Sequence, residues 1–492
     1  MTRTLLFLGM VAIPFSAFNG LPLLGELAPE LSTYFFIPAV GSAMLAYIVH
    51  GASGMTTQFT PSPRILTAIM LVTVGIIMMS FVANAASIMT ISAGGRYAFA
   101  KFATSLAVVL YGFALSYVYF FEAGRDWHRL VFKPIAISAL ICVVYSVFEI
   151  LSKKGGIASG FFGALDDFVH AGWNPSVYNA GWDERIRSVS FEAPAFGNYV
   201  GFAWPWLMAA WIDNTSRSRR GYFVVWLLLT AIELYSFSRT AIVMMGGSIA
   251  LLALLRYGYM PARFRPSGRI MRRLLTVAIL AASALVVAVA ASKFERYEAS
   301  VIAGSSVSDL TRLAYTEATV KMMVSHPAFG LGLGQFAFWL LDYVPSWAYL
   351  SYEVADWAAH APPVHYWPAT YSVYGRLASE LGAVGLVAWI VLWVGLGQQI
   401  LVSSLDHQKR TGLLPAVAFP LIVSCACVLL SGLTTDTFRS PMIWITLGLS
   451  CRFLSEARRN AGRHAREVAL RTRYFTPSAL ASGVPGRTHH PI

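Results

Sequence analysis

The chain has 492 residues, of which 57% are hydrophobic and only 12% are charged. A soluble domain of this size could not bury so much apolar surface, which excludes an ordinary soluble protein and indicates a membrane protein. The formal net charge of +13 fits basic loops that orient membrane helices better than it fits nucleic-acid binding.

Apolar stretches recur along the chain, and most could cross about 30 Å of hydrocarbon as a helix. Glycine and proline inside several of them are normal for membrane helices. No cleavable signal peptide is predicted, because the first stretch leads into others without a small-residue cleavage site. The twelve predicted spans are residues 4–20, 31–50, 65–88, 99–120, 131–151, 195–212, 221–237, 240–256, 274–292, 378–404, 413–433 and 440–455.

Basic side chains gather in alternate loops, and the positive-inside rule places such loops in the cytoplasm. Both termini are then cytoplasmic, and residues 152–194 and 293–376 form long outward loops. We therefore predict a polytopic membrane domain over 1–455 and a basic cytoplasmic tail over 456–492, which also suits anionic lipid headgroups. The loop residues that set this orientation are Arg125, Arg129, Lys133, Arg217, Arg219, Arg220, Arg256, Arg263, Arg265, Arg269, Arg272, Arg273, Lys409 and Arg410.

The cysteines give no sign of a disulfide or a metal site. Cys142, Cys425, Cys427 and Cys451 all fall in apolar stretches, so none can link the outward loops. The Cys425-Ala-Cys427 pair is too short and too apolar for zinc.

Several arginines face outward, against the bias that orients the chain. Each either pairs with a loop acid or binds an anion, because a guanidinium matches the oxygens of a phosphate or pyrophosphate. The second interpretation is favoured for Arg187, Arg239 and Arg312, which lie at the membrane surface, and it indicates a large anionic substrate rather than a channel. The outward set is Arg96, Arg185, Arg187, Arg239, Arg296, Arg312, Arg376 and Arg439.

Arg187 begins a polar segment, residues 187–199, that leads directly into a predicted span. Pro194 and Gly197 indicate a turn at the bilayer surface. Glu192 in this turn either forms a salt bridge with Arg187 or acts as a carboxylate that accepts a proton or orients a sugar hydroxyl.

Arg239 and Arg312 have different predicted settings. Arg239 falls in a tight outer turn at 235–240, where it binds either the substrate or lipid headgroups. Arg312 falls in the first turns of an amphipathic helix capped by Ser308, where the helix dipole also favours an anion. The apolar face of that helix comprises Leu310, Leu313, Ala314, Ala318 and Met322, and the helix ends at His326-Pro327.

The glycines at 329–336 do not follow a soluble strand, so they predict a tight, backbone-exposing turn rather than a nucleotide site. Residues 336–374 are rich in aromatic side chains, among them Trp357, Trp367 and Tyr371. These form either an interfacial belt or a platform on which sugar rings stack. His360 and His365 in the same stretch lack metal-ligand spacing, and each is either structural or catalytic.

These segments together resemble the O-antigen ligase and polymerase superfamily of bacterial membrane glycosyltransferases over roughly residues 185–450. The resemblance rests on four segments: Arg187 to Tyr199, Ser-Arg-Thr at 238–240, His-Pro-Ala-Phe-Gly-Leu-Gly-Leu-Gly-Gln-Phe at 326–336, and Glu-Leu-Gly-Ala-Val-Gly-Leu at 380–386. The motifs are individually loose, and their order together with the topology makes the resemblance specific.

The resemblance implies an all-α, GT-C-like integral membrane protein with about 12 transmembrane helices and a large periplasmic loop, in the bacterial inner membrane. It implies a substrate built on undecaprenyl diphosphate, with Arg239 and Arg312 expected to bind the diphosphate, and transfer without a metal, cofactor or nucleotide sugar. Expected partners are membrane lipids and the chain-length regulator and flippase of the same pathway, with no nucleic acid.

The ligases of this superfamily resemble one another in a histidine and a polar residue followed nine residues later by Gly-x-x-Gly. Here Ser372, Gly382 and Gly385 match, but Tyr371 stands at the histidine position. A tyrosine with an ordinary pKa of about 10 is a poor base near neutral pH. The difference favours a polysaccharide polymerase, with His365 or Glu192 as the base, over a ligase.

A lipid-linked glycan transporter is the remaining alternative. Transporters usually contain internal repeats and ionisable groups near the bilayer centre. No clear repeat is present, and the acids Glu122, Glu149 and Glu233 lie toward the ends of spans. The pattern therefore favours an enzyme.

Overall fold

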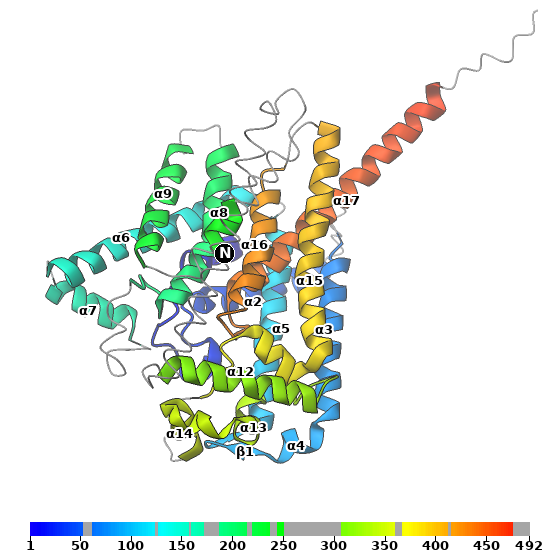
Figure 1. Cartoon of the computed structure of the whole chain (residues 1–492). Coiled ribbons are helices and arrows are strands. Elements are labelled where there is room, and N and C mark those ends of the chain that lie inside the picture. The colour runs from blue at the N-terminus through cyan, green and yellow to red at the C-terminus, as the bar shows by residue number, and fades with distance from the viewer. Residues whose placement is uncertain are drawn as a thin grey trace, which may run out of the picture.

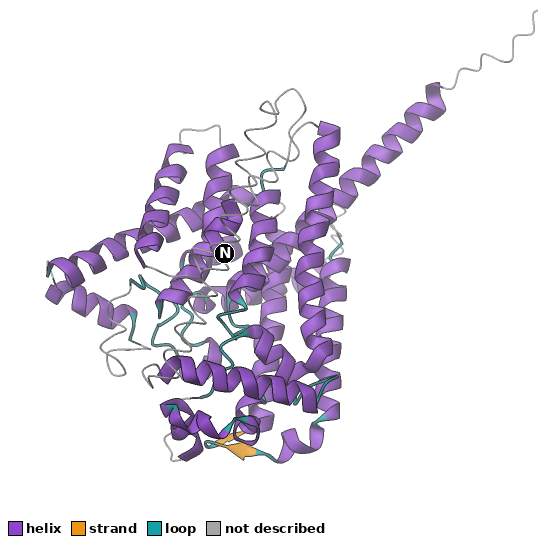
Figure 2. Cartoon of the chain, viewed as in Figure 1, coloured by secondary structure: helices purple, strands orange, loops and turns teal. Residues whose placement is uncertain are grey.

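The computed structural model describes residues 1–52, 62–123, 126–156, 159–171, 186–213, 219–236, 244–249, 307–359, 367–411 and 415–475. Over these residues the chain is helical apart from loops and one small antiparallel hairpin, β1 (Ser92–Ala93) with β2 (Arg96–Tyr97) (Figure 2). The prediction of an all-α fold is confirmed at this level.

The long helices form a bundle (Figure 1). Their hydrophobic side chains build one large core, to which Phe36, Phe120 and Trp204 contribute. The bundle helices are α1 (Thr2–Val11), α2 (Thr33–Ala52), α3 (Arg64–Ala83), α5 (Ala98–Ala123), α6 (Lys133–Gly155), α8 (Ala193–Asp213), α9 (Arg219–Ser236), α15 (Val373–Thr411), α16 (Ala418–Ser431) and α17 (Pro441–Phe475).

Four helical stretches among the described residues are long and apolar enough to cross a membrane. They are Arg64–Ala83, Ala98–Ala123, His128–Lys153 and Val373–Lys409. Three further apolar helices are shorter: Thr2–Val11, Thr33–Val49 and Ala418–Ser431. A membrane protein is therefore supported, whereas the number of twelve spans stays a prediction. Of the predicted spans, 274–292 lies outside the described residues and 240–256 lies mostly outside them.

The predicted first span, 4–20, is wrong in length. Helix α1 ends at Val11, because Pro14 has no N–H for a further helical hydrogen bond. The chain then folds back through irregular turns and the 3₁₀ helix η1 (Pro22–Leu27), and it pairs with itself where Phe18 N donates to Pro29 O. The predicted span 65–88 is also interrupted, at Asn84, after which the short helix α4 (Ala85–Thr90) begins.

Shorter helices cover one end of the bundle (Figure 1). They are α12 (Val307–Ser325), α13 (Phe336–Tyr343), the 3₁₀ helix η6 (Ser346–Leu350) and α14 (Tyr352–Ala359). The predicted amphipathic helix is confirmed, since α12 buries Leu310, Ala314, Ala318 and Met322. The predicted cap is wrong, because α12 begins at Val307 and Ser308 lies inside it. These helices build a second, smaller core of their own, centred on Tyr315 and Trp357.

Two of the motifs behind the resemblance pack against each other. We call residues 327–334 and 379–385 together the glycine clasp. Helix α15 is kinked at Gly382, whose φ is 65°, and the turn at 327–334 lies against this kink. Across the contact Leu331 N donates to Ser379 O at 2.9 Å, and Ala383 N donates to Pro327 O at 2.8 Å. The tight turn is therefore confirmed, but its backbone is buried rather than exposed.

Glycine is required on both sides of the clasp. A Cβ on Gly330 would lie 2.5 Å from the carbonyl carbon of Glu380, and a Cβ on Gly382 would lie 2.6 Å from that of Ala328. Both glycines also have positive φ, which side-chain-bearing residues rarely adopt. Ser80 on α3 adds to the contact by donating to Phe329 O at 2.6 Å.

Arg376, which the sequence predicts to face outward, is part of this architecture and is buried. Its Nε lies 3.0 Å from Glu380 Oε2, and its Nη1 donates to the backbone oxygen of Asp436 at 2.9 Å. Its guanidinium also lies 5.1 Å from the ring centroid of Phe438. Arg376 therefore ties α15 to the segment before α17.

Two shorter helices lie on either side of α6 in the chain. The π helix η2 (His128–Phe132) leads into α6, and α7 (Ser159–Val169) lies within the predicted outward loop 152–194. Helix α17 continues past the predicted domain boundary at 455 to Phe475. The basic tail thus begins as a continuation of the last helix rather than as a separate segment.

Candidate active site

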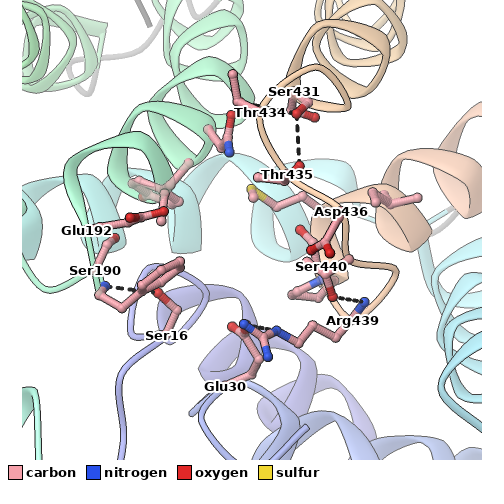
Figure 3. A pocket seen from close by; sticks show the side chains of 18 of the residues that line it. Ser16, Glu30, Ser190, Glu192, Ser431, Thr434, Thr435, Asp436, Arg439 and Ser440 are labelled. Carbon is pink, nitrogen blue, oxygen red and sulfur yellow. Dashed lines mark hydrogen bonds and ion pairs between the residues drawn. The ribbon is translucent and has the colours of Figure 1, made fainter. Parts of the chain in front are cut away.

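A cavity of about 510 Å³ lies where several irregular segments meet beside the bundle. Its wall combines the turns after α1, the start of α8, helix α14, the residues before α15, the end of α16 and the segment 434–443. Figure 3 shows this cavity from close by. Its charged lining residues are Glu30, Glu192, Glu353, Asp356, Asp436 and Arg439.

Glu192 lies on the wall of the cavity, directly before α8, and its backbone oxygen accepts from Phe196 N at 3.1 Å. The preceding residues are held by the turn after α1, since Ser190 Oγ donates to Pro14 O at 2.9 Å and Phe191 N donates to Ser16 Oγ at 3.3 Å. Figure 3 shows Glu192 and Asp436 on opposite sides of the cavity. The position of Glu192 fits a group that contacts a bound substrate.

Arg439 enters the cavity from the segment before α17 and meets Glu30, with Arg439 Nε 3.3 Å from Glu30 Oε1 (Figure 3). Glu30 belongs to the turn between η1 and α2 and is 7% exposed. Burial raises the pKa of its carboxyl to about 7, although the charge of Arg439 acts in the opposite direction. The cavity therefore contains a guanidinium whose counter-ion titrates near neutral pH.

Tyr371 also lines the cavity, and its hydroxyl donates to Glu353 Oε2 at 2.6 Å. Its φ of 56° is unusual for a residue with a side chain, and such strain is often found at functional sites. The Arg312 guanidinium lies 5.2 Å from the centroid of the Tyr371 ring, and Tyr315 stacks with that ring at 6.0 Å. The exposed side chain of Arg312 is thereby held next to the cavity wall.

Arg187 takes part in a different cluster. Its Nη2 lies 2.7 Å from Asp166 Oδ2 on α7, so the loop acid that pairs with it is Asp166 rather than Glu192. His170 Nδ1 lies 3.0 Å from the same carboxylate. Burial alone would raise the pKa of Asp166, but His170, Tyr145 and Arg187 hold it well below its usual range. This cluster supports the segment that carries Glu192, because His170 Nε2 contacts Ser190 O at 3.0 Å.

The two tryptophans of the expected sugar platform differ in exposure. Trp357 is 1% exposed and packs edge to face against Trp367, with ring centroids 5.0 Å apart. Trp367 is half-buried and lies under the Arg96 guanidinium, 4.6 Å from its ring centroid, with Lys101 Nζ at 5.5 Å. Trp357 is therefore buried in the protein and packs against other side chains. The prediction that aromatic rings stack against sugar rings is kept for Trp367 and Tyr371.

Three of the predicted site residues lie outside the described residues: Arg239, His360 and His365. The chain on either side of the two histidines contributes Asp356 and Ala369 to the cavity wall. Their roles stay predictions.

The sequence analysis did not identify several acids that line the cavity. It placed Arg439 among the outward arginines but did not single it out as a candidate site residue. A usable signal was the polar run 434–440, Thr-Thr-Asp-Thr-Phe-Arg-Ser, which lies between two apolar stretches. Polar and charged residues this close to membrane spans often belong to a functional site. Glu30 and Glu353 carried no such signal, since only the fold brings them to the same cavity.

An apolar groove of about 770 Å³ runs between α3 and α15. Val72 and Ile76 line it from α3, and Val387 lines it from α15. Phe438 and Trp444 line it as well, whereas Asp436 and Arg439 line the polar cavity. The segment 436–444 thus forms part of the wall of both the groove and the cavity.

These features define an α-helical membrane protein in which a cavity with several charged side chains in a largely apolar wall lies beside helices of membrane-spanning length. Within the described ranges, no group of three or more His, Cys, Asp or Glu residues is placed to hold a metal ion.

Residues 223–390, about a third of the chain, match the family model of the O-antigen ligases. The match confirms the resemblance to the O-antigen ligase and polymerase superfamily over this region. It includes α12 to α14 and both halves of the glycine clasp. No curated protein matches the chain. The family match supports, at a coarse level, an enzyme that acts on lipid-linked oligosaccharides in a membrane.

Proposed function

We propose that the protein is a polymerase that joins undecaprenyl-diphosphate-linked oligosaccharide repeat units into O-antigen or exopolysaccharide at the periplasmic face of the inner membrane. The observation that carries the proposal is the segment 436–444, which has the apolar groove along one part and the cavity with its charged side chains along another. A substrate with a hydrocarbon tail, a diphosphate and sugars needs such neighbouring apolar and polar sites.

In this proposal the polyprenyl tail lies in the groove between α3 and α15, and the sugars lie in the cavity. Arg439 and Arg312 contact the diphosphate, and Arg239, which lies outside the described residues, is a further proposed contact. Arg187 contributes by its charge, while its ion pair with Asp166 keeps the Glu192 segment in place. The guanidinium groups stabilise the negative charge that develops on the leaving diphosphate, which we expect to be the largest catalytic contribution of the protein.

The proposed reaction is a direct displacement. A hydroxyl oxygen of the acceptor sugar forms a bond to the anomeric carbon of the donor, and the bond from that carbon to the diphosphate oxygen breaks. Undecaprenyl diphosphate leaves with the electron pair, and the hydroxyl proton passes to a base, for which Glu192 and His365 are the candidates. Attack opposite the leaving group inverts the anomeric configuration. The diphosphate linkage supplies the driving force.

The polymerase is preferred over a ligase that transfers glycan to a lipid A-core acceptor. The ligases' histidine position is Tyr371, and its hydroxyl is engaged as a donor to Glu353. A phenol in that state has no free proton-accepting role near neutral pH. A transporter of the lipid-linked glycan is a weaker alternative, because the described charged residues of the cavity come from turns and helix ends.

The glycan profile of a deletion strain tests this proposal. A polymerase predicts that long chains disappear while single repeat units remain attached to their acceptor. Loss of all attached glycan would indicate the ligase, and accumulation of the lipid-linked unit on the cytoplasmic side would indicate the transporter. Expression of the wild-type chain from a plasmid is the control, and an unchanged profile in the deletion strain would contradict all three.

A further inference from the structure

The two partners of the ion pair between Arg439 and Glu30 differ in exposure, although both line the cavity (Figure 3). The side chain of Arg439 is 28% exposed, whereas that of Glu30 is 9% exposed. The Nε of Arg439 is buried and has no hydrogen-bond partner among the described residues, although it lies 3.3 Å from Glu30 Oε1. The charges are therefore close without the aligned hydrogen bond that makes such a pair strong. The guanidinium can turn toward the cavity, and the carboxylate stays buried in its turn.

Other titratable and charged groups surround the pair from η1, α5, α15 and the segment before α17. They are the ion pairs Lys101–Glu26 and Arg376–Glu380, together with Tyr111 and Asp436. Both basic side chains of this set are thus paired with other acids. In the described part of the chain, Arg439 is the cation that balances Glu30. A ligand that withdraws Arg439 therefore leaves a buried carboxylate without its counter-ion.

A buried carboxylate without a counter-ion is costly, and it avoids this cost by binding a proton. Burial already raises the pKa of Glu30 to about 7, and Arg439 acts in the opposite direction. Withdrawal of the guanidinium removes this opposing effect, so the pKa of Glu30 rises further. Protonation of Glu30 in turn removes the charge that competes with the ligand for Arg439. Ligand binding and proton uptake therefore favour each other.

We propose that Glu30 is a positioning residue that holds Arg439 at the cavity wall and releases it to the substrate diphosphate by taking up a proton. The proton comes from solvent and binds a carboxylate oxygen of Glu30, and no other covalent bond forms or breaks in this step. The inference rests on the proposed function, since Arg439 is one of the proposed contacts of the diphosphate.

Calorimetric titration of the full-length protein in lipid nanodiscs tests the inference. The probe is a short polyprenyl diphosphate that carries glucose, a diester whose phosphates do not titrate near neutral pH. Titration in buffers with different ionisation enthalpies gives the number of protons taken up. We expect about 0.5–0.7 proton per lipid at pH 7.5, and an affinity that falls about threefold to fivefold from pH 7 to pH 8. The fall follows because the free protein holds this proton less tightly than the complex.

Three variants assign the proton to Glu30. Glu30→Gln should bind the lipid without proton uptake and with an affinity that does not change from pH 7 to pH 8. Arg439→Gln should bind it more weakly and also without uptake, because Glu30 is then already protonated. Glu122→Gln is the matched control, since Glu122 pairs with Arg3 and does not line the cavity. It should keep the proton uptake of the wild-type protein.

The outcomes separate this inference from the proposed function. Tight binding by the wild-type protein without proton uptake would overturn the role of Glu30 and leave the proposed function standing. Uptake that persists in Glu30→Gln or in Arg439→Gln would assign the proton to another group and would overturn the inference as well. Failure of the wild-type protein to bind the lipid would overturn both proposals.

Discussion

The glycine clasp involves α15 and the cavity adjoins the residues that precede this helix, but the two regions are built in opposite ways. In the clasp, backbone groups bond directly to one another and glycines allow contacts that no side chain could replace. In the cavity, charged side chains from distant segments line an open space, and two buried polar atoms of the described residues, Asn198 Oδ1 and Ser424 Oγ, have no hydrogen-bond partner. Two of the four motifs that resemble the family thus mark where two backbones must touch, whereas the proposed chemistry draws on residues scattered along the chain.

Arg376 connects the two regions. It pairs with Glu380 in the clasp and bonds to the backbone of Asp436, whose side chain lines the cavity. A change in the clasp should therefore reach the cavity, whereas a change in the cavity should leave the clasp folded. The predictions below test this asymmetry.

The largest effect is expected for Gly382→Ala. The new Cβ would clash with the backbone of Ala328, and the φ of 65° would be strained, so we expect a loss of about 3–6 kcal/mol of stability. Thermal unfolding of the detergent-purified protein measures it. Gly395→Ala in the same helix is the control, because a Cβ there meets nothing within 4 Å. Equal stability of the two variants would show that the clasp is not required.

Arg376→Met should cost about 3–5 kcal/mol, because it leaves the Glu380 carboxylate buried without its partner. The double variant with Glu380→Gln should be the more stable of the two, since no buried charge then remains. Chemical unfolding of both variants beside the exposed-site control Arg458→Met measures this. A double variant less stable than the single one would contradict the assignment of a buried ion pair.

Arg312→Ala, Arg239→Ala and Arg439→Ala should each lower polymer formation about 10²- to 10³-fold while the protein stays in the membrane. Lysine at these positions should restore little, because a point charge lacks the paired geometry of a guanidinium. The assay is transfer between lipid-linked oligosaccharides by the purified variants. Full activity of the lysine variants would show that charge alone suffices.

Replacement of the base should slow turnover and spare substrate binding. Glu192→Gln or His365→Gln should lower kcat about 10²-fold or more with little change in affinity for the donor. Glu317→Gln on the exposed side of α12 is the control, since its ion pair with Lys321 lies at the surface. Near-normal turnover of both single variants and of the double variant would exclude both residues, and the acceptor proton would then pass to water or to the diphosphate.

The smallest effect concerns pH. The folded protein raises the pKa of Glu30 from 4.5 to about 7, so the native state holds this proton more tightly than the unfolded chain does. Stability should therefore fall as pH rises from about 4.5 to about 7, by on the order of 1–3 kcal/mol. Glu30→Gln should remove this dependence in unfolding curves measured across that range. An identical pH dependence in the variant would assign it to another group.

The sequence was sufficient for the class of fold, because hydrophobicity and helical period are local properties. The apolar face of α12 and its end before His326-Pro327 followed from spacing alone. The break at Asn84 did not, since the chain leaves the helix there to make tertiary contacts. Asn84 Nδ2, for example, donates to Gly330 O across the clasp. The early end of α1 was missed, although Pro14 is a local signal for it.

The candidate site was predictable only in part. Glu192 was identified because it stands in a polar segment just before a span, and the structure places it in the cavity. The acid that pairs with Arg187 could not be predicted from the sequence. That acid is Asp166 and not Glu192. Glu30 and Glu353 are more than 300 residues apart in sequence and share one cavity. Residues this far apart in sequence come together through the packing of distant helices. A local sequence pattern does not indicate that packing.

Helix α17 has a mechanical consequence. Its 35 residues span about 52 Å at 1.5 Å per residue, whereas the hydrocarbon layer is about 30 Å thick. No upright position could keep the whole helix inside a bilayer, so part of it must project as a stiff rod. A group attached to its far end would turn and tilt with the bundle instead of moving freely on a tether. Removing four residues would draw that end about 6 Å inward and rotate it by roughly 40°.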